Sequence, residues 1–320
     1  MNEMLQEFQK LGIIPVVKID RAEDAEKLAG ALIAGGLPVA EVTFRTKAAK
    51  DAIAAMSKAF PTMLVGAGTV LTTGQVDEAV AAGAKFIVSP GLNPKVVRYC
   101  QEIGIPVMPG VSGPSEIEQA LELGLEAVKF FPAEANGGLA KIKAMSAPYG
   151  DLMFMPTGGI NADNLKAYLQ FDKVLACGGS WMVKSDLINA GEFDKIEALT
   201  REAVRKMLGF ELKHIGINSE NETEAQKTAD LFTGIFGFEQ RDTAISVFCG
   251  RGFEIMKYMG EGRLGHIAVM TDSFERAMAY LERNGIELRY DTIKLDEKGK
   301  PYLIYLKQDF GGFSVHLAKK

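Results

Sequence analysis

The sequence predicts an α/β protein, with a (β/α)8 TIM barrel followed by a smaller α+β domain of paired βαβββ modules. Two observations carry this prediction. Short apolar runs alternate with helical patterns from the N-terminus to about residue 208, as in parallel sheets covered by helices. Beyond that point two similar segments begin with histidine-led strands, one at His214 and one at His266. We therefore expect a barrel domain over residues 1–208 and a second domain over residues 211–320.

Composition and charge describe an ordinary globular protein. Apolar residues make up 47% of the chain and charged residues 24%, which is typical of soluble domains. A formal charge of −5 gives no reason to expect nucleic acid or an anionic membrane as a partner. The first residues show no basic region before an apolar core, and no apolar run is long enough to span a bilayer. We therefore expect a cytoplasmic protein.

The number and spacing of the cysteines also favour a cytoplasmic protein. Cys100, Cys177 and Cys249 are odd in number and widely spaced. This pattern predicts reduced thiols, and neither a disulfide framework nor a cysteine zinc site.

Eight apolar runs are expected to form the barrel strands. They span residues 13–19, 39–45, 63–70, 86–89, 106–111, 127–131, 154–156 and 174–177. Helical patterns lie between and after them, among others at residues 22–34, 48–60, 75–82, 94–102, 115–123 and 193–208. A doubly wound sheet is the alternative, but no Gly-x-Gly-x-x-Gly turn follows the first strand. The barrel is favoured, and it places chemistry at the carboxyl ends of its strands.

The sixth of these runs holds a lysine among apolar residues. In residues 127–132, Ala-Val-Lys-Phe-Phe-Pro, alternation leaves neither face polar enough for a solvated strand. A lysine buried there must be paired or must be neutral with a depressed pKa. Lys129 could extend its ammonium group to an exposed strand end, or it could be an amine nucleophile that forms a Schiff base. The strand alone leaves both interpretations open.

Three polar side chains share one face of the second strand. Alternation puts Glu41, Thr43 and Arg45 together on that face. Barrel interiors are normally filled by branched apolar side chains, so inward polar residues are costly unless they are used. A Glu–Arg ion pair on the barrel floor is the alternative. Small residues on the next strand, Gly-Ala-Gly-Thr at 66–69, leave room for a ligand and favour a functional site.

Paired glycines are expected after strands seven and eight. Residues 157–160 are Thr-Gly-Gly-Ile and residues 178–181 are Gly-Gly-Ser-Trp. Such loops expose backbone N–H groups, and barrels often bind phosphate at this place. A tight turn would also require glycine, but two pairs in adjacent loops together indicate a phosphate site.

Together these residues resemble the 2-keto-3-deoxy-6-phosphogluconate (KDPG) / 4-hydroxy-2-oxoglutarate (KHG) aldolase family. The matching stretches are Glu-Val-Thr-Phe-Arg-Thr (41–46), Gly-Ala-Gly-Thr-Val (66–70), Ser-Pro-Gly (89–91), Lys-Phe-Phe-Pro-Ala-Glu (129–134), Pro-Thr-Gly-Gly-Ile (156–160) and Gly-Gly-Ser-Trp (178–181). The resemblance covers about the first 208 residues in order. It implies a class I aldolase on a barrel, independent of metals and cofactors and usually a homotrimer.

The resemblance implies a role for each matching residue. Lys129 corresponds to the Schiff-base lysine, and Glu41 to the acid/base that moves protons through the carbinolamine and enamine steps. The substrate-binding residues correspond to Arg45 and Thr69 for the pyruvate carboxylate, and to Gly158, Gly159 and Ser180 for the phosphate. Burial and a nearby guanidinium should lower the lysine pKa from about 10.4. Lys18, at the end of strand one, could help with a distal anion or could simply be solvated.

The last third of the chain shows a duplicated pattern. Strands beginning at His214 and His266 are each followed by a helix, at residues 223–236 and 274–284, and then by about three strands. This βαβββ repeat resembles the vicinal oxygen chelate fold of glyoxalases, extradiol dioxygenases and antibiotic-resistance binders. The resemblance spans about residues 211–318.

In that fold the first and last strands of each module can present metal ligands. The matching positions are His214, Glu254, His266 and His316, which include all 3 histidines of the chain. A mixed imidazole and carboxylate set suits zinc, nickel, manganese or ferrous iron. The family more often has glutamate where His316 stands. A metal-free binding module with structural histidines is the alternative.

The sequence thus predicts a pyruvate-forming class I aldolase fused to a glyoxalase-like domain. Its expected substrate is a small keto acid: KDPG, cleaved to pyruvate and glyceraldehyde 3-phosphate, or KHG, cleaved to pyruvate and glyoxylate. A phosphate-binding isomerase is one alternative, and it would need acid/base residues but no buried lysine. A metabolite sensor with a degenerate barrel is another, and the intact set of Glu41, Arg45, Thr69 and Lys129 argues against it.

Overall fold

The computed structural model describes residues 3–320, which form two compact units. The first unit ends at Met207, and the second runs from Leu208 to Lys320. No helix among the described residues is both long enough and apolar enough to cross a membrane.

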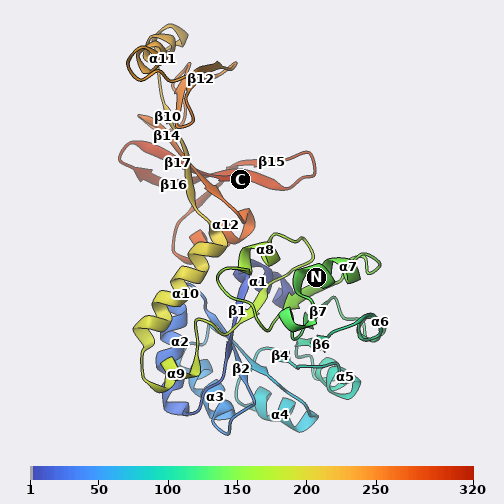
Figure 1. Ribbon diagram of the computed structural model, residues 1–320. Coiled ribbons are helices and arrows are strands. Elements are labelled where there is room, and N and C mark those ends of the chain that lie inside the picture. Colours follow the sequence, from blue (N-terminus) through green and yellow to red (C-terminus); the bar gives the residue numbers. More distant parts are fainter. Residues whose placement is uncertain (1–2) are drawn as a thin grey trace. The chain divides into compact units, whose positions relative to one another are not determined.

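The first unit is a barrel of parallel strands with helices around its outside (Figure 1). Its strands are β1 (Ile13–Val17), β2 (Val39–Thr43), β3 (Leu64–Gly68), β4 (Ile87–Val88), β5 (Val107–Met108), β6 (Gly110–Val111), β7 (Ala127–Phe130), β8 (Met153–Pro156) and β9 (Cys177–Gly179). Its helices are α1 (Glu3–Leu11), α2 (Ala25–Ala34), α3 (Ala49–Ala59), α4 (Thr73–Ala81), α5 (Pro94–Glu102), α6 (Pro114–Glu122), α7 (Gly138–Ser146), α8 (Leu165–Leu169), α9 (Ser185–Asn189) and α10 (Phe193–Leu208), with short 3-10 turns at Ala22–Asp24 and Glu134–Asn136.

Two hydrogen-bonded sheets close into one ring. One has the order β5-β4-β3-β2-β1-β9 and the other β6-β7-β8. β5 and β6 are halves of one predicted strand, interrupted at Pro109, whose ring removes a backbone donor. Parallel bridges between Phe154 and Val174 and between Thr157 and Gly178 join β8 to the β9 segment. The predicted barrel is therefore confirmed.

The last barrel strand differs from its prediction. We expected it over residues 174–177, whereas β9 itself contains Gly178 and Gly179. A Cβ on Gly178 would lie 2.2 Å from Thr157 Oγ1, and one on Gly179 would lie 1.9 Å from the Trp181 ring. These glycines are therefore required by close packing inside the barrel and do not form the loop that follows it.

Helix α1, which the sequence analysis did not predict, covers the amino ends of several strands. Its Leu5, Phe8 and Leu11 are buried. Phe8 packs edge-on against Phe86, with ring centroids 4.9 Å apart. A cavity of about 160 Å³ lies beside these rings. The carboxyl ends lie at the opposite end of the barrel.

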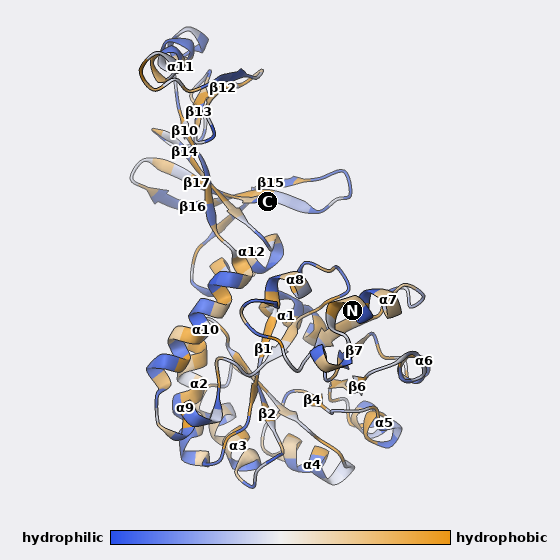
Figure 2. Cartoon of the chain, viewed as in Figure 1, coloured by the Kyte–Doolittle hydropathy of each residue, from blue (hydrophilic) through white to orange (hydrophobic). Residues whose placement is uncertain are grey.

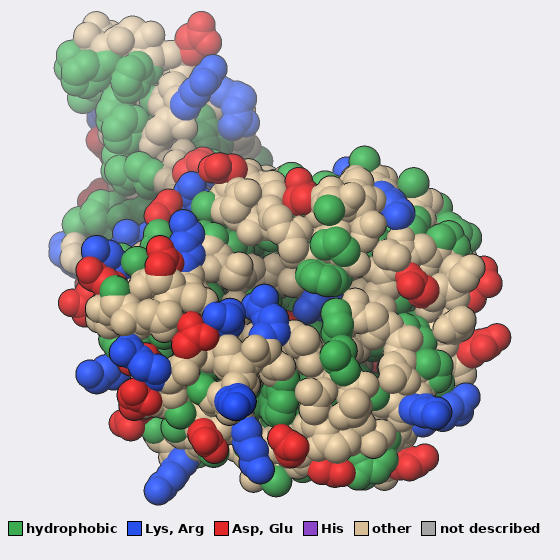
Figure 3. Space-filling model, turned by 60° about the horizontal axis from the view of Figure 1, so that its bottom comes forward, with side chains coloured by type: hydrophobic (Ala, Val, Ile, Leu, Met, Phe, Trp, Pro, Cys, Tyr) green, Lys and Arg blue, Asp and Glu red, His purple; other side chains and the backbone are tan. Residues whose placement is uncertain are grey.

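Hydropathy and charge follow this architecture. Apolar residues run along the barrel strands, while the helices alternate between apolar and polar residues (Figure 2). Glu41 and Lys129 are exceptions, because they are charged residues buried within strands. Lysine and arginine side chains gather near the middle of the face of the barrel that Figure 3 displays.

The second unit repeats one βαβββ module. The first module comprises β10 (Glu211–Ile217), α11 (Glu222–Phe236), β11 (Gln240–Asp242), β12 (Ser246–Cys249) and β13 (Phe253–Met256), and the second β14 (Gly265–Thr271), α12 (Phe274–Arg283), β15 (Leu288–Leu295), β16 (Pro301–Phe310) and β17 (Phe313–Lys319). All these strands form one sheet with the order β11-β12-β13-β10-β14-β17-β16-β15. The order reads the same from either edge, and the central strands β10 and β14 are antiparallel. The modules are therefore related by a pseudo-two-fold axis.

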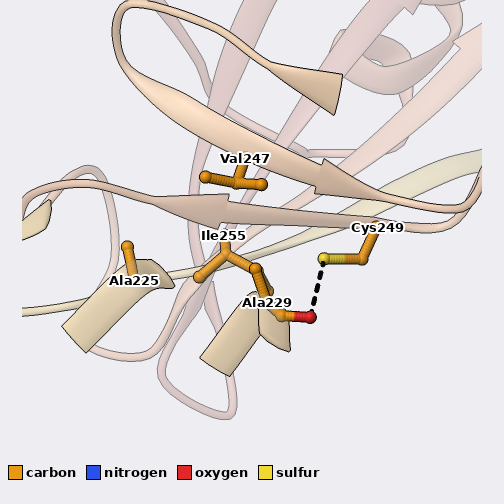
Figure 4. Packing of buried hydrophobic residues seen from close by; sticks show 5 residues of the cluster. All are labelled: Ala225, Ala229, Val247, Cys249 and Ile255. Atoms are coloured by element: carbon orange, nitrogen blue, oxygen red, sulfur yellow. Dashed lines mark hydrogen bonds between the residues drawn. The ribbon is translucent and has the colours of Figure 1, made fainter. Parts of the chain in front are cut away.

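Each module packs a helix on one face of the sheet. In the first module, Ala225 and Ala229 of α11 pack with Val247, Cys249 and Ile255 of the strands (Figure 4). In the second module, α12 lies against β16 and β17. Because side chains alternate along a strand, the intervening residues face the opposite side of the sheet.

Candidate active site and candidate metal centre

Lys129 and Glu41 meet inside the barrel. Lys129 Nζ on β7 lies 3.1 Å from Oε1 of Glu41 on β2, and both side chains are almost fully buried. The two strands belong to different sheets of the barrel, so the contact crosses its interior. Phe131 lies beside the amine, with its ring centroid 5.3 Å from Nζ. The lysine does not reach solvent, which removes the exposed-end interpretation.

The two oxygens of the Glu41 carboxylate differ. Oε1 accepts the hydrogen bond from Lys129, whereas Oε2 is buried without a partner among residues 3–320. A Cβ on Gly68 would lie 2.2 Å from Oε1, so β3 must have glycine beside the carboxylate. An unsatisfied buried oxygen costs about 1–3 kcal/mol. A carboxylate with one free oxygen beside an amine is suited to exchange a proton with a molecule bound there.

Threonine and arginine follow at the end of β2. Thr43 Oγ1 donates to the Val17 carbonyl at 2.8 Å and accepts from Arg45 Nε at 3.0 Å. We predicted that Arg45 would share the inner face of the strand, but β2 ends at Thr43 and Arg45 is exposed in the turn that follows. Its guanidinium is therefore positioned to meet an anion that enters the barrel from solvent.

Thr69 follows β3 in a strained conformation. Its φ of 57° lies in the left-handed region, which costs a β-branched residue about 1–3 kcal/mol. Register pairs Gly68, which precedes it, with Thr43 of β2. Thr69 therefore lies at the same end of the barrel as Arg45. Such strain is found most often at ligand sites.

The segments that follow β8 and β9 are neighbours, because these two strands are adjacent in the barrel. Gly158 and Gly159 have φ of 99° and 84°, a region that favours glycine. Ser180 follows β9, which the Thr157–Gly178 bridge joins to β8. Within the described part of the chain, the N–H groups of Gly159 and Ser180 donate to no protein acceptor. They can therefore donate to an anion.

Lys18 does not join the buried pair. Its Nζ lies 2.8 Å from Asp20 Oδ1, and both side chains are substantially exposed. The ion pair offsets the charge of this lysine at the end of β1.

The second unit brings the four expected metal ligands together. His214 Nε2 lies 3.1 Å from His266 Nε2. Glu254 Oε2 lies 2.9 Å from His214 Nε2 and 3.3 Å from His266 Nε2. Ligand atoms of His214, His266 and His316 all lie within 4.8 Å of one another. All four side chains are buried.

Sheet register explains this convergence. Gly216 of β10 is paired with both Glu254 of β13 and His266 of β14. Ala268 of β14 is paired with His316 of β17. A Cβ on Gly216 would lie 2.1 Å from the His266 ring, so only glycine leaves room for that imidazole. The small residues at the centre of the sheet thus make space for the larger ligands beside them.

The electrostatics of this cluster favour metal-binding protonation states. Burial alone would raise the pKa of Glu254, but hydrogen bonds from His214, His266 and Ser246 outweigh burial and lower it. Ser246 Oγ donates to Glu254 Oε1 at 2.7 Å and leaves Oε2 on the histidine side. Burial, together with the nearby His266, lowers the pKa of His316 to about 4. An ionised carboxylate and a neutral imidazole are the forms that coordinate divalent metals.

Sequence reasoning missed three residues around this cluster. They are Ser246, Phe248 and Tyr305. Phe248 meets His214 edge-on with ring centroids 5.8 Å apart, and the Tyr305 ring lies 4.9 Å from that of His316. Burial, followed by the charge of Glu261, raises the pKa of Tyr305 to about 12, so its hydroxyl stays protonated near neutral pH. No motif marks these residues, and their proximity follows from strand register.

The first unit has clear relatives. Residues 4–199 match the family model of KDPG and KHG aldolase. The 2-dehydro-3-deoxy-phosphogluconate aldolase of Treponema pallidum (strain Nichols) is 49% identical over 205 residues, which is 64% of this chain and 98% of that protein. The KHG/KDPG aldolase of Escherichia coli (strain K12) is 46% identical over 192 residues, 60% of this chain and 90% of that protein.

A solved structure shows the same similarity. The KDPG aldolase from Legionella pneumophila, with pyruvate captured at low pH as a covalent carbinolamine intermediate, superposes with a TM-score of 0.61 and 41% identity. The match covers 63% of this chain and 98% of that one.

Proposed function

This chain belongs to the KDPG and KHG aldolase family, and we propose on that basis that its first unit is a class I, pyruvate-forming aldolase. Its substrates are KDPG, KHG or both. The single observation that carries the mechanism is the buried contact of 3.1 Å between Lys129 Nζ and Glu41 Oε1. Imine chemistry requires an amine nucleophile and an acid/base group within hydrogen-bond reach of it.

Lys129 acts as the nucleophile. Its neutral amine adds to the C2 carbonyl carbon of the keto acid and forms a carbinolamine. Glu41 takes the proton that the amine loses and supplies one to the departing hydroxyl, which leaves as water. The resulting iminium carbon is a strong electron acceptor next to the C3–C4 bond.

Cleavage then follows from proton transfer. Glu41, directly or through one water, accepts the proton of the C4 hydroxyl as the C3–C4 bond breaks. The bonding electrons become the enamine, and the aldehyde leaves. Protonation at C3 and hydrolysis of the iminium release pyruvate and regenerate Lys129. The partnerless oxygen of Glu41 supports its role in these transfers.

The substrate carboxylate is held at the ends of β2 and β3. The Arg45 guanidinium is suited to a planar carboxylate because it can donate two parallel hydrogen bonds. Thr69 helps to hold the same carboxylate from its strained position after β3. The N–H groups of Gly158, Gly159 and Ser180 hold the phosphate of KDPG. This cradle makes the phosphorylated keto acid the better substrate.

Borohydride trapping tests the aldolase assignment. Reduction in the presence of pyruvate should attach the ligand covalently, and peptide mass mapping should find the adduct on Lys129. An adduct on Lys18 or another lysine would contradict the assigned nucleophile. An isomerase or a sensor would give no adduct.

For the second unit we propose a divalent metal centre in a glyoxalase-like domain of the vicinal oxygen chelate type. Its ligands are His214, Glu254, His266 and His316. The paired modules and the buried cluster of their side chains support this proposal. The donor set suits zinc, nickel, manganese or ferrous iron. A bound metal would supply a Lewis acid for an oxygen ligand, while Ser246 holds Glu254 in place.

Elemental analysis tests the metal centre directly. Protein purified without an affinity tag, or incubated with each of these four metals, should retain about one ion per chain. The matched control is His266→Ala, which removes one donor and should lower the retained metal. A chain that stays metal-free after all four incubations would support a binding module with structural histidines.

A further inference from the structure

A row of side chains crosses the first module on the face opposite its helix. Strand register pairs Arg241 with Phe248, and Phe248 with Glu254. The Arg241 guanidinium carbon lies 4.2 Å from the centroid of the Phe248 ring, whose centroid is 5.8 Å from the His214 ring. The neighbouring side chain of Gln240 bonds to α11 on the other face. Arg241 is therefore on the same face as the proposed metal ligands.

The second module repeats this row. Register pairs Arg289 with Tyr305, and Tyr305 with His316. The Arg289 guanidinium carbon lies 6.0 Å from the centroid of the Tyr305 ring. The pseudo-two-fold axis thus places one arginine and one aromatic ring on each side of the four-residue cluster.

The two arginines differ in their charge partners. Arg289 Nη1 is 2.7 Å from Glu261 Oε2, so a carboxylate of the protein balances it. Arg241 has no acidic partner within ion-pair distance in the described range, residues 3–320. The carboxylate next to it in sequence, Asp242, is 2.9 Å from Lys257. One side of the cluster therefore keeps an unbalanced positive charge.

We propose that Arg241 is the anion-binding residue of this site and that the site takes an elongated small molecule with an anionic group at each end. This inference rests on the proposed metal centre. One end of the ligand supplies oxygen donors to the metal, and the other end reaches the guanidinium. The ring of Phe248 supports the guanidinium from one side and leaves its N–H groups for the ligand.

The spacing of the strands sets the length of the ligand. Adjacent strands lie about 4.8 Å apart, and Arg241 is two strands from Glu254. The two anchoring groups are thus separated by about 10 Å or less, depending on how far the side chains lean. Dicarboxylates and phosphorylated carboxylic acids of five or six carbons meet this requirement. KDPG and KHG belong to the same chemical class.

Cobalt(II) bound to the full chain gives a spectroscopic test, and keto acids that bind in the barrel do not affect its signal. The visible absorption of the ion reports only on ligands near the metal. The probes are 2-oxoglutarate and 2-oxopentanoate, which have the same length and the same 2-oxo acid end but differ in the second carboxylate. We expect 2-oxoglutarate to bind at least about tenfold more tightly than 2-oxopentanoate, because a charge-assisted hydrogen bond from Arg241 to the second carboxylate can supply a tenfold gain in affinity.

The variant Arg241→Gln should bring the two affinities within about twofold of each other. Arg251→Gln is the matched control, because Arg251 is an exposed arginine in the same module, and it should keep the preference. Equal cobalt stoichiometry in all three proteins shows that the site is intact. If Arg241→Gln binds cobalt and still prefers 2-oxoglutarate to the same extent, the assignment of Arg241 is wrong, while the metal centre stands. A chain that binds neither cobalt nor any of the four proposed metals overturns the metal centre, and the ligand assignment with it.

Discussion

The two units use buried polar side chains at strand positions in different ways. In the barrel, one lysine and one glutamate balance each other's charge, and one carboxylate oxygen remains without a partner. In the second unit, His214, His266 and Glu254 lie within hydrogen-bond distance of one another, and the ligand atoms of the three histidines all lie within 4.8 Å of one another. The first arrangement pairs an amine with a carboxylate that keeps one acceptor oxygen free. The second gathers imidazole nitrogens and a carboxylate in one place, a donor set of the kind that binds divalent cations.

Both sites are buried, so the kind of donor, more than burial, decides which chemistry each site can support. An amine can form a covalent bond to a carbonyl carbon, whereas imidazole nitrogens are the commonest metal ligands. Changes at one site should therefore leave the other unaffected, because neither donor set includes a residue of the other.

The largest effect is expected from Lys129→Met. Loss of the nucleophile should lower kcat on the order of 10⁴-fold or more, and the borohydride adduct with pyruvate should disappear. Metal content should stay unchanged. Lys141→Met is the control, because Lys141 is also near an aromatic ring, Phe130, but belongs to helix α7. If Lys141→Met were the inactive variant, the nucleophile would be wrongly assigned.

Glu41→Gln should lower kcat by about 10²–10⁴-fold, which is the usual contribution of a general acid/base. The amide keeps the size of the side chain but cannot carry the proton. Steady-state rates of pyruvate formation measure the effect, and KM should change much less than kcat. Near wild-type turnover would mean that the proton carrier lies elsewhere in the barrel.

His266→Ala should lower metal affinity by more than about 100-fold, because loss of a ligand exceeds the effect of losing a supporting residue. Competition with a chromogenic chelator measures the affinity. Pyruvate formation should be the same in this variant as in the wild type, and the same after the wild type is treated with chelator. A parallel loss of aldolase activity would show that the two units are coupled.

Ser246→Ala should lower metal affinity by about 10–100-fold, as expected for a residue that orients a ligand. The reason is the hydrogen bond of 2.7 Å from Ser246 to Glu254, which fixes one carboxylate oxygen. Ser246→Thr keeps the hydroxyl and should recover most of the affinity. If both variants bind metal as the wild type does, Ser246 has only a packing role.

Ser180→Asp should produce the smallest change, lowering kcat/KM for KDPG by about tenfold through like-charge repulsion with the phosphate. The rate with KHG, which has no phosphate, should stay close to the wild-type value. The ratio of the two specificity constants is the measurement. Equal losses with both substrates would indicate that the segments around Gly158 and Ser180 do not bind phosphate.

Local sequence patterns were sufficient to predict the architecture of both units. The alternation of apolar runs with helical segments predicted the barrel, which the structure and the relatives confirm. Period-two alternation placed Lys129 on a strand buried on both faces and Glu41 inside the barrel. The duplicated pattern in the last third predicted both βαβββ modules. These features depend on residues close in sequence, so hydropathy and spacing are sufficient to reveal them.

The contacts among these residues depend on segments that lie far apart in the sequence. The Lys129–Glu41 contact crosses the barrel, and Arg45 lies beyond the end of its strand. Gly178 is packed against Thr157, although its sequence predicted a loop. The row that includes Arg241 depends on the register of three strands. A one-residue change of register would turn these side chains to the other face of the sheet, and register is set by packing between residues that local sequence does not connect.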